Sequence, residues 1–405
     1  MDFTPSEAQR ELAALTRRIV TDQVTTDMLV AAETAGERLD QPLWSLLATA
    51  GVLSAEVGLV ERCSVLIELG RVLAPVPYLS TVAAAGATLA EFGSADQRDR
   101  WLIPAPAGQV VLAVAPFDDY AARPSAAGRS EPSWRLSGRQ AGTPEAVAPE
   151  AVAPEAGAAW QLTGEVSGVT AGPVADAFLV AAETPAGSAV FVVLPTDPGV
   201  TVERQQMVDN DDAALVRLAD VPLAEDRRLA GSGLAGSGLA GSGASSWLAD
   251  RVTVGLCAYQ LGVLQRALEL TSEHARTRIQ FGRPIGAFQA VSQRLADAYV
   301  DVQAAELALW NAAWILENPA DTAGSDAGAG PEAAAEAAAA VATAKFWAAE
   351  AGHRVAHTLV HVHGGTGIDL EHPVHRFFLA AKRTEFEQGG ATAHLLHLAN
   401  ALASK

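Results

Sequence analysis

The sequence is poor in cysteine, in aromatic residues and in positive charge. Its 405 residues include 2 cysteines and 28 Lys plus Arg against 47 Asp plus Glu, which gives a formal net charge of −19. Cys63 and Cys257 lie far apart with no CxxC pair, so the sequence shows neither a disulfide framework nor a thiolate metal site, and a reducing cytoplasm fits. A field this negative repels phosphate backbones and anionic lipid, so nucleic acid is not an expected partner.

Long hydrophobic runs are missing as well. Uncharged apolar stretches do not reach the roughly 18 residues that suggest a membrane-spanning helix, and the N-terminus lacks the basic and then apolar layout of a signal peptide. The chain is nevertheless 49% hydrophobic, which is enough to form a large core or several packed domains. We therefore expect a cytoplasmic protein without a membrane span.

The spacing of apolar residues divides the chain into three regions. Helical spacing predicts an N-terminal α-helical domain over residues 1–103. Short β-rich runs separated by Pro, Gly and Asp predict a middle β-barrel or sandwich domain over 104–224. Helical spacing returns over 246–405 and predicts a C-terminal four-helix bundle. The predicted fold class is therefore α+β, with the strands between two helical regions.

Three segments have the composition of linkers or disordered insertions. Pro144-Glu-Ala-Val-Ala is followed by copies of itself, which predicts a disordered insertion at about 141–157. Leu-Ala-Gly-Ser-Gly occurs three times from Leu229, which predicts a linker over 225–245. Residues 318–330 are rich in Ala, Gly, Asp and Pro, which predicts a mobile loop between two bundle helices.

Two segments of the C-terminal region carry a family resemblance. The first reads Arg278-Ile-Gln-Phe-Gly-Arg-Pro-Ile-Gly-Ala-Phe-Gln289, and the second reads His363-Gly-Gly-Thr-Gly-Ile-Asp-Leu-Glu-His-Pro-Val-His-Arg376. In this order they resemble the acyl-CoA dehydrogenase family, where the first is a turn between two long bundle helices and the second a glycine loop before a basic helix. The order of helices, strands and helices agrees independently with the fold that the resemblance implies.

The first segment has the chemistry of a dinucleotide contact. Arg278, Gln280 and Phe281, with the glycine that follows, offer a guanidinium, an amide, a ring and close backbone approach within five positions. The resemblance implies that these residues reach across a dimer interface to an FAD that the neighbouring subunit mainly binds, with Gln289 in the same contact set. An ordinary surface turn is the alternative.

The glycine loop is a poor match to a phosphate loop of the Walker or Rossmann type. No strand is expected before it, and it lacks the Gly-Lys-Ser/Thr ending. The resemblance implies instead that the backbone at Gly364 and Gly365 packs against the adenine–ribose side of FAD. His361 stands where the family usually has Gln, and an imidazole cannot reproduce the paired donor and acceptor of an amide.

A row of histidines precedes this loop. His353, His357 and His361 are spaced by four and share one helical face, a spacing that can bind a transition metal. No Asp or Glu accompanies them on that face within a turn, and the family uses no metal. We expect a packed or interface face and no metal site.

The catalytic base is the residue with competing candidates. Dehydrogenation of an acyl-CoA thioester needs a carboxylate that removes the α proton while the flavin takes the β hydride. The family's base follows the basic helix, where a gapless match selects Gln388 but a match on Phe-Glu selects Glu387, our candidate base. A second family position falls near Asp250 and Val252, where Val252 is apolar and Asp250 is shorter than Glu.

The β region departs from the family in its flavin wall. Val166 or Val169 stands where the family has a Trp, and an isopropyl group cannot stack on a flavin as an indole does. The wall therefore looks degraded, whereas the Arg278 segment is kept. Such an asymmetry is typical of the paired subunits found among actinobacterial members of the family, including those that act on steroid side chains.

These observations predict an FAD-dependent α,β-dehydrogenation of an acyl-CoA thioester. The chain would act as the FAD-sharing subunit of a heteromer with another acyl-CoA dehydrogenase subunit, and an electron-transfer flavoprotein is the expected electron acceptor. Two alternatives stay open. The chain could be a self-sufficient homo-oligomer that uses Glu387, or a flavin-free accessory subunit.

Overall fold

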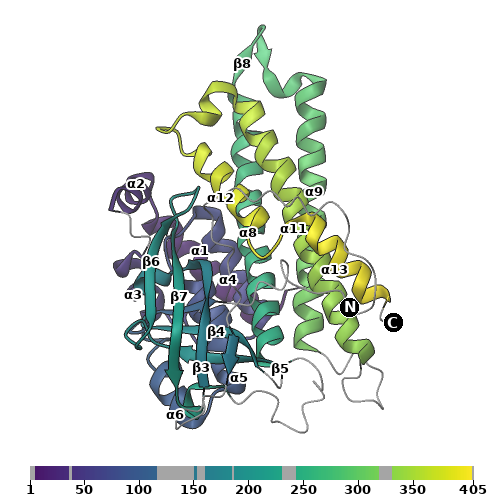
Figure 1. The fold of residues 1–405 in the computed structure, drawn as a ribbon. Helices are drawn as coiled ribbons and strands as arrows, with labels where there is room; N and C mark the ends of the chain where they lie inside the picture. Colours follow the sequence, from purple (N-terminus) through teal and green to yellow (C-terminus); the bar gives the residue numbers. More distant parts are fainter. Residues whose placement is uncertain are drawn as a thin grey trace, which may run out of the picture.

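The computed structural model describes residues 5–35, 39–115, 150–152, 160–184, 187–229, 243–318 and 331–403. Most of the predicted insertion, linker and mobile loop lies outside the described residues. The described chain runs through helices, then strands, then a helical bundle (Figure 1). This order confirms the fold class that the sequence predicts.

The N-terminal region consists of short helices, two of which are π-helical. The first helix begins at a capping box, in which Ser6 Oγ accepts from the Gln9 N–H and Gln9 Oε1 accepts from the Ser6 N–H. The elements are α1 (Glu7–Gln23), α2 (Thr26–Ala35), α3 (Gln41–Thr49), α4 (Leu59–Val72), η1 (Leu79–Gly86), α5 (Ala87–Phe92), α6 (Ala95–Gln97) and η2 (Arg98–Leu102).

The middle region is a mixed, mainly antiparallel sheet with strand order β1-β4-β2-β3-β7-β6, and β5 pairs with β4. The described strands follow an open path, so they form a sheet domain and not the closed barrel that was one predicted form. The elements are β1 (Leu112–Ala115), β2 (Glu150–Val152), β3 (Trp160–Thr170), η3 (Gly172–Val174), β4 (Ala177–Thr184), β5 (Gly187–Val193), β6 (Val200–Gln206), β7 (Asp212–Leu223) and η4 (Glu225–Arg227).

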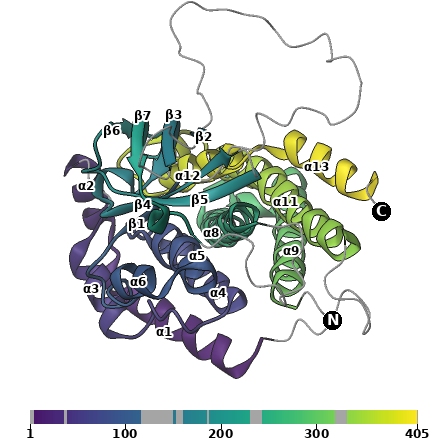
Figure 2. The ribbon, with the colours of Figure 1, turned by 60° about the horizontal axis from the view of Figure 1, so that its bottom comes forward.

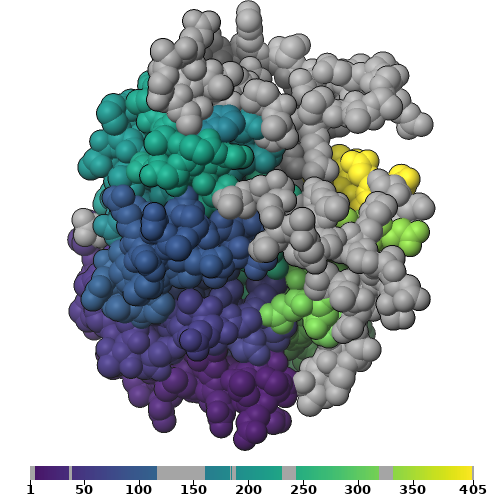
Figure 3. All heavy atoms as spheres, turned by 90° about the horizontal axis from the view of Figure 1, so that it is seen from below, coloured from purple at the N-terminus to yellow at the C-terminus, as the bar shows by residue number. Residues whose placement is uncertain are grey.

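Strand β4 is buried on both faces because alternate side chains enter two different cores. Phe178 and Val180 point into the core of the sheet region, whereas Ala177 and Leu179 pack in a cluster that includes Leu248 of the bundle. The sheet is therefore attached to the helices through one of its faces. Seen from below, the purple and blue N-terminal helices adjoin the teal strands (Figure 3).

The C-terminal region is a bundle of α8, α9, α11 and α12, with α13 packed on α11. None of the helices in the described ranges combines the length and the apolar character needed to cross a bilayer. The elements are α8 (Ala244–Thr277), β8 (Ile279–Gln280), β9 (Arg283–Pro284), η5 (Ile285–Ala287), α9 (Gln289–Glu317), α11 (Pro331–His363), η6 (Gly364–Ile368), α12 (Val374–Phe386) and α13 (Ala391–Ala403).

Helix α8 joins the bundle to the N-terminal region. A Cβ on Gly262 would overlap the carbonyl oxygen of Ile67, and a Cβ on Gly70 would overlap that of Tyr259, so the backbones of α4 and α8 touch. Figure 2 shows α8 between the N-terminal helices and the α9–α11 pair. The end of the sheet, the start of η1 and the end of α12 thereby meet around one side of α8.

Candidate functional site

A cavity of about 570 Å³ lies where the sheet, α8 and the end of α12 meet. Its walls include Val166 and Val169 of β3 and Val252 of α8. Glu387 and Gln388, the two competing positions for the base, line its opposite side. On the strand side the wall offers small apolar groups and hydroxyls but no aromatic ring among the described lining residues.

The turn after α12 places both candidate residues. Glu387 caps the helix in an extended conformation, and its N–H donates to the Arg383 carbonyl at 3.1 Å. Gln388 and Gly389 follow with φ of 58° and 85°, which turn the chain back toward α13. Adjacent residues of this turn therefore face the cavity with different chemistry, one with a carboxyl group and one with an amide.

Two buried side chains from other helices hold this turn. Lys345 of α11 is fully buried, and its Nζ donates to the carbonyls of Thr384 at 2.9 Å and Glu385 at 3.1 Å, which are among the last of α12. His394 of α13 donates from Nε2 to the Gln388 carbonyl at 2.7 Å. Burial lowers the pKa of Lys345 and lowers the pKa of His394 to about 4.

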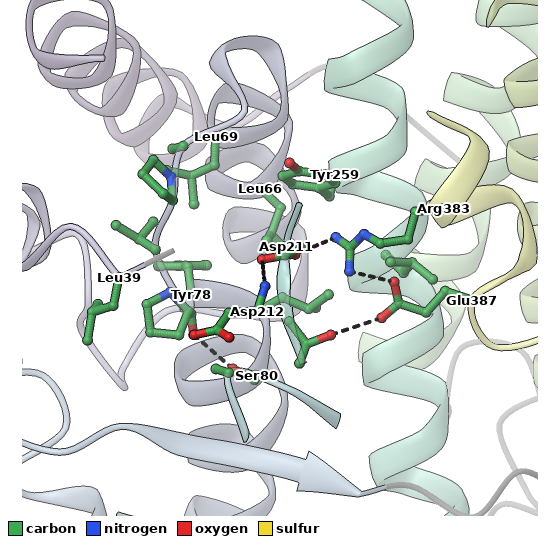
Figure 4. A pocket seen from close by; sticks show the side chains of 18 of the residues that line it. Leu39, Leu66, Leu69, Tyr78, Ser80, Asp211, Asp212, Tyr259, Arg383 and Glu387 are labelled. Atoms are coloured by element: carbon green, nitrogen blue, oxygen red, sulfur yellow. Dashed lines mark hydrogen bonds and ion pairs between the residues drawn. The ribbon is translucent and has the colours of Figure 1, made fainter. Parts of the chain in front are cut away.

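Glu387 is bound in an ion cluster rather than free in the cavity. Arg383 Nη1 lies 3.0 Å from Glu387 Oε2, and the same guanidinium reaches Asp211 Oδ2 at 2.9 Å (Figure 4). It also reaches Asp209 Oδ2 at 2.8 Å. The two aspartates belong to the loop between β6 and β7. Burial opposes the charge of Arg383, but Asp209, Glu387 and Asp211 outweigh it and hold the guanidinium pKa well above its usual range. We call these four residues the Arg383 cluster.

The carboxyl group of Glu387 has a second partner on the sheet. Thr170 Oγ1 donates to Glu387 Oε1 at 3.4 Å. Burial raises the pKa of Glu387, and Arg383 opposes that rise. A smaller cavity of about 70 Å³, lined by Leu66, Leu69 and other apolar groups, lies beyond Arg383 and Glu387, so the pair stands between two cavities.

The Arg278 segment forms a hairpin at the far end of the bundle from the sheet (Figure 1). Strands β8 and β9 pair around Phe281 and Gly282, whose φ angles of 52° and 78° are those of a type I′ turn. Phe281 is 91% exposed, and Arg278, Gln280 and the first residue of α9, Gln289, are exposed too. The hairpin presents a cation, an amide and a ring to whatever lies outside the chain.

The glycine loop lies at the same end of the bundle. Gly364 has φ of 62°, and a Cβ on either Gly364 or Gly365 would meet nothing within 4 Å. Both glycines and His361 are exposed. None of the predicted FAD contacts of this chain is among the described lining residues of either cavity, whereas Glu387, the candidate base, lines both. The predicted cofactor segments and the predicted base are therefore at different places in one chain.

Comparison with known proteins decides the family. The acyl-CoA dehydrogenase N-terminal domain model matches residues 6–109, and the acyl-CoA dehydrogenase C-terminal domain model matches residues 248–403. The chain is 42% identical to the acyl-CoA dehydrogenase FadE27 of Mycobacterium tuberculosis, over all of this chain and 99% of the relative. The chain belongs to the acyl-CoA dehydrogenase family.

Two solved structures are similar to this chain in sequence as well as in fold. The ChsE4-ChsE5 complex from Mycobacterium tuberculosis contains a chain 40% identical to this one, with a TM-score of 0.81 and all of both chains covered. A chain of the Tcur3481-Tcur3483 steroid ACAD is 33% identical, with a TM-score of 0.80 and 98% of both chains covered. FadE28 of Mycobacterium tuberculosis is 28% identical over all of this chain.

For an acyl-CoA dehydrogenase, the described residues fit the outer part of FAD. The space over Gly364 and Gly365 is one that a side chain would fill, and the exposed Arg278 and Phe281 lie at the same end of the bundle. A flavin ring placed in this chain's own cavity would meet Val166 and Val169 of β3 rather than an indole. All the predicted FAD contacts of this chain stay predictions, namely those of Arg278, Gln280, Phe281, Gln289, His361, Gly364 and Gly365.

The histidine row and the second base position have simple structural roles. The rings of His353 and His357 lie 4.5 Å apart, and His353 Nδ1 is 3.2 Å from Glu385 Oε1. Within the described ranges no group of three or more His, Cys, Asp or Glu is placed to hold a metal ion. Val252 lines the large cavity but carries no titratable group, and Asp250 does not line it.

Sequence reasoning missed the Arg383 cluster. One signal was present, because Arg383 and Glu387 are four residues apart and side chains at that spacing meet on a helix. Asp209 and Asp211 carried no such signal, since their approach to α12 depends on how the sheet packs on the bundle. Lys345 could not be identified either, because a lysine in an alanine-rich helix normally faces water.

Proposed function

We propose that this acyl-CoA dehydrogenase is the FAD-sharing subunit of a heteromeric enzyme, and that a second family subunit supplies the base and the flavin wall. The observation that carries the proposal is a contrast between the Arg278 hairpin and the turn after α12. Arg278 and Phe281 are exposed on a hairpin and line neither of the two cavities described, whereas Glu387 is held by Arg383 in the chain's own cavity.

The reaction needs a carboxylate that is free to take the α proton of the thioester. Bound FAD supplies the acceptor for the β hydride. Glu387 would first have to leave Arg383, and separating one partner from a buried ion pair costs about 3–5 kcal/mol. A cost of that size in the transition state slows a reaction by roughly two to four orders of magnitude. Glu387 is therefore a poor base in the observed arrangement.

The neighbouring positions do not replace it. Gln388 lines the cavity, but an amide takes up no proton in the physiological range. Val252 lines the cavity from α8 and offers only methyl groups. The partner subunit would thus contribute the carboxylate, and this chain would contribute binding groups.

Those binding groups are at the far end of the bundle. Arg278 would pair with the pyrophosphate of an FAD held mainly by the partner, since a guanidinium binds phosphate oxygens in bidentate fashion. Phe281 would cover the cofactor with its exposed ring. Gly364 and Gly365 would let the adenosine part approach the backbone, because no Cβ occupies that space.

Several further observations support a second subunit and a thioester substrate. The relatives named ChsE4-ChsE5 and Tcur3481-Tcur3483 steroid ACAD are a complex and a steroid enzyme, which favours a heteromer and a bulky steroid acyl-CoA substrate for this chain. Apolar side chains are exposed on α9 and α13, at Tyr299, Val300, Leu307, Leu395, Leu396 and Leu402.

Two cellular features complete the proposal. An electron-transfer flavoprotein would reoxidise the cofactor. The cytoplasm is the compartment we propose, since Cys63 and Cys257 are buried free thiols.

A second candidate function is a self-sufficient dehydrogenase. The position of Glu387 favours it, because this carboxyl group lines the large cavity and burial raises its pKa, as a general base requires. In that case the substrate would have to displace Arg383 from Glu387.

Co-purification separates these functions. The chain is purified alone and with a family subunit that carries an intact base and flavin wall, and flavin absorbance and turnover of acyl-CoA and steroid-CoA thioesters are measured with a ferrocenium acceptor. Flavin and activity only in the pair support the proposal. Flavin and activity in the isolated chain, abolished by Glu387→Gln, would establish the self-sufficient enzyme. A pair that is active but gains no flavin contact from this chain would identify an accessory subunit.

A further inference from the structure

Three histidines connect the Arg278 hairpin with the glycine loop. His274 lies one turn before Arg278 on α8, His363 is the last residue of α11, and His372 lies between η6 and α12. The rings of His274 and His363 are stacked with centroids 4.3 Å apart and an interplanar angle of 27°. The ring of His372 follows at 6.0 Å from that of His363. We call these three residues the histidine stack.

The stack is the contact between the ends of two helices that each lead into a predicted cofactor segment. The Arg278 N–H donates to the His274 carbonyl at 2.8 Å, so the base of the hairpin follows directly from the position of His274. Gly364 is bonded covalently to His363. A change in the distance between the two rings would therefore change the distance between the hairpin and the loop.

Hydrogen bonds define the state of one ring nitrogen in each of two rings of the stack. Nδ1 of His363 is 2.8 Å from the Leu359 carbonyl, an acceptor, so this nitrogen carries a proton. Nδ1 of His372 accepts from the Val374 N–H at 3.3 Å at the start of α12, so this nitrogen carries none.

The charges around the stack act in the same direction. Burial, Arg278 and His372 lower the pKa of His274. Burial, His274 and His372 lower the pKa of His363, against a rise from its bond to Leu359. The side chains that shift the pKa of these two rings are an arginine and other histidines. They lie on α8, at its end and in the segment before α12, and no described carboxylate is among them.

We propose that His274, His363 and His372 are positioning residues that hold the helix ends carrying the Arg278 hairpin and the glycine loop together, and that protonation of His274 and His363 releases the two segments. This inference rests on the proposed function only in that the two segments are assumed to bind FAD. The ring contacts of the histidine stack lie within this chain and do not depend on a cofactor.

The direction of the pH effect follows from linkage. A histidine whose pKa is lower in the closed arrangement than in the open one favours the closed arrangement at neutral pH. Below about pH 6.5, the ordinary pKa of histidine, the open arrangement binds more protons and gains population, by up to about tenfold per pH unit for each proton taken up. A cofactor phosphate beside Arg278 would oppose this protonation, so the free full-length chain is the material for the test.

Hydrogen exchange of the full chain measures the release directly. Protection factors are recorded for residues 278–286 and 364–368 from neutral to mildly acidic pH, in wild type, His274→Phe and His274→Ala. Phenylalanine keeps a ring against His363 but takes no proton, whereas alanine removes the contact. His357→Phe on α11 is the matched control, because His357 also has a lowered pKa and ring contacts but lies outside the stack.

The proposal expects four results. Protection of both segments falls together in wild type as the pH drops, by about tenfold per unit in the titrating range. His274→Phe loses clearly less protection than wild type across that range, because one titrating ring of the stack is gone and His363 remains. His274→Ala has low protection at every pH, and His357→Phe behaves as wild type. Equal pH profiles for wild type and His274→Phe would overturn the proposal, as would independent loss of protection in the two segments.

A second measurement keeps this result separate from the proposed function. FAD retention of the chain with its partner is followed for the same variants by absorbance. Absence of flavin in every preparation would contradict the FAD-sharing role while leaving the exchange result valid. Flavin binding with unchanged exchange profiles would contradict the stack alone.

Discussion

Arg383 and Glu387 form an ion pair of 3.0 Å between Nη1 and Oε2, one turn apart at the end of α12. The Arg383 side chain is 8% exposed and the Glu387 side chain is 19% exposed. Through Asp209 and Asp211 the same guanidinium also binds the β6–β7 loop. The carboxyl group that the family resemblance suggested as a base is thus part of the ion cluster that connects the sheet with the bundle. Freeing Glu387 from Arg383 inside the cavity would therefore also weaken the contact between these two regions.

Removal of Arg383 should destabilise the fold strongly. Arg383→Met would leave Asp209, Asp211 and Glu387 without their cation in a buried site, and breaking such a pair from one side costs about 3–5 kcal/mol. Urea denaturation of the isolated chain measures the change in the free energy of unfolding. Arg276→Ala is the control, since Arg276 is 72% exposed and its pair with Glu273 spans 3.5 Å.

A double variant checks that uncompensated charge is the cause. Arg383→Met with Glu387→Gln leaves fewer unpaired carboxylates than Arg383→Met alone, so its loss should be smaller than the sum of the two single losses. Strict additivity, or a loss in Arg383→Met no larger than in Arg276→Ala, would show that the cluster contributes little to the fold.

The long helices could be predicted from the sequence because each repeats a period of 3.6 over many residues. Helices α8, α9, α11, α12 and α13 all lie within residues 246–405, where helical spacing predicts a bundle, apart from the first two residues of α8. The hairpin could be predicted as a turn, since Phe281 and Gly282 lie between two long helical patterns. These features depend on residues close together in the sequence.

The ion pairing of Glu387 in the large cavity could not be predicted in the same way. Whether Glu387 is free or paired depends on where the loop of Asp209 and Asp211 lies relative to α12, which is set by packing of the sheet on α8. The fully buried Lys345 likewise depends on the position of the end of α12. Sequence motifs identified the turn after α12, but whether the Glu387 carboxyl group is paired depends on contacts between regions far apart in the sequence.

Stability should fall as the pH drops through the range of His394. Burial lowers its pKa to about 4, below the ordinary value near 6.5, so the unfolded chain binds more protons between these values. The contribution of neutral His394 is fully present above about pH 6.5, and roughly 3 kcal/mol of it is lost by pH 4. Urea denaturation at a series of pH values measures the slope.

Variants on α13 assign this slope to one residue. His394→Gln can still donate to the Gln388 carbonyl but does not titrate, so its stability should depend less on pH than that of wild type. His397→Gln, on the same helix, should change the slope only slightly, because burial and not His397 is the main cause of the lowered pKa of His394. A slope unchanged in His394→Gln would exclude His394 as its source.

Two glycines should respond differently to a single methyl group. In Gly262→Ala the new Cβ would overlap the Ile67 carbonyl, which forces α4 and α8 apart and should destabilise the chain by about 1–3 kcal/mol or more. In Gly365→Ala the methyl group meets nothing within 4 Å, so the stability of the isolated chain should hold. Thermal unfolding compares them, and a destabilised Gly365→Ala would mean that the loop packs against its own chain.

Arg278 should matter for FAD retention in whatever oligomer forms, and Glu387 should not. Arg278→Ala removes charge-assisted hydrogen bonds worth roughly 1.5–3 kcal/mol, which corresponds to about 10- to 150-fold in affinity. Glu387→Gln acts inside the Arg383 cluster, away from the exposed hairpin, so flavin occupancy should stay close to that of wild type. Heat release of the flavin followed by absorbance measures occupancy, with Arg276→Ala, two residues before Arg278, as the exposed arginine control. Equal occupancy in Arg278→Ala and wild type would refute the contact across the interface. Loss of flavin in Glu387→Gln but not in Arg278→Ala would place the cofactor in this chain's own cavity, and the self-sufficient mechanism with Glu387 as base would then follow.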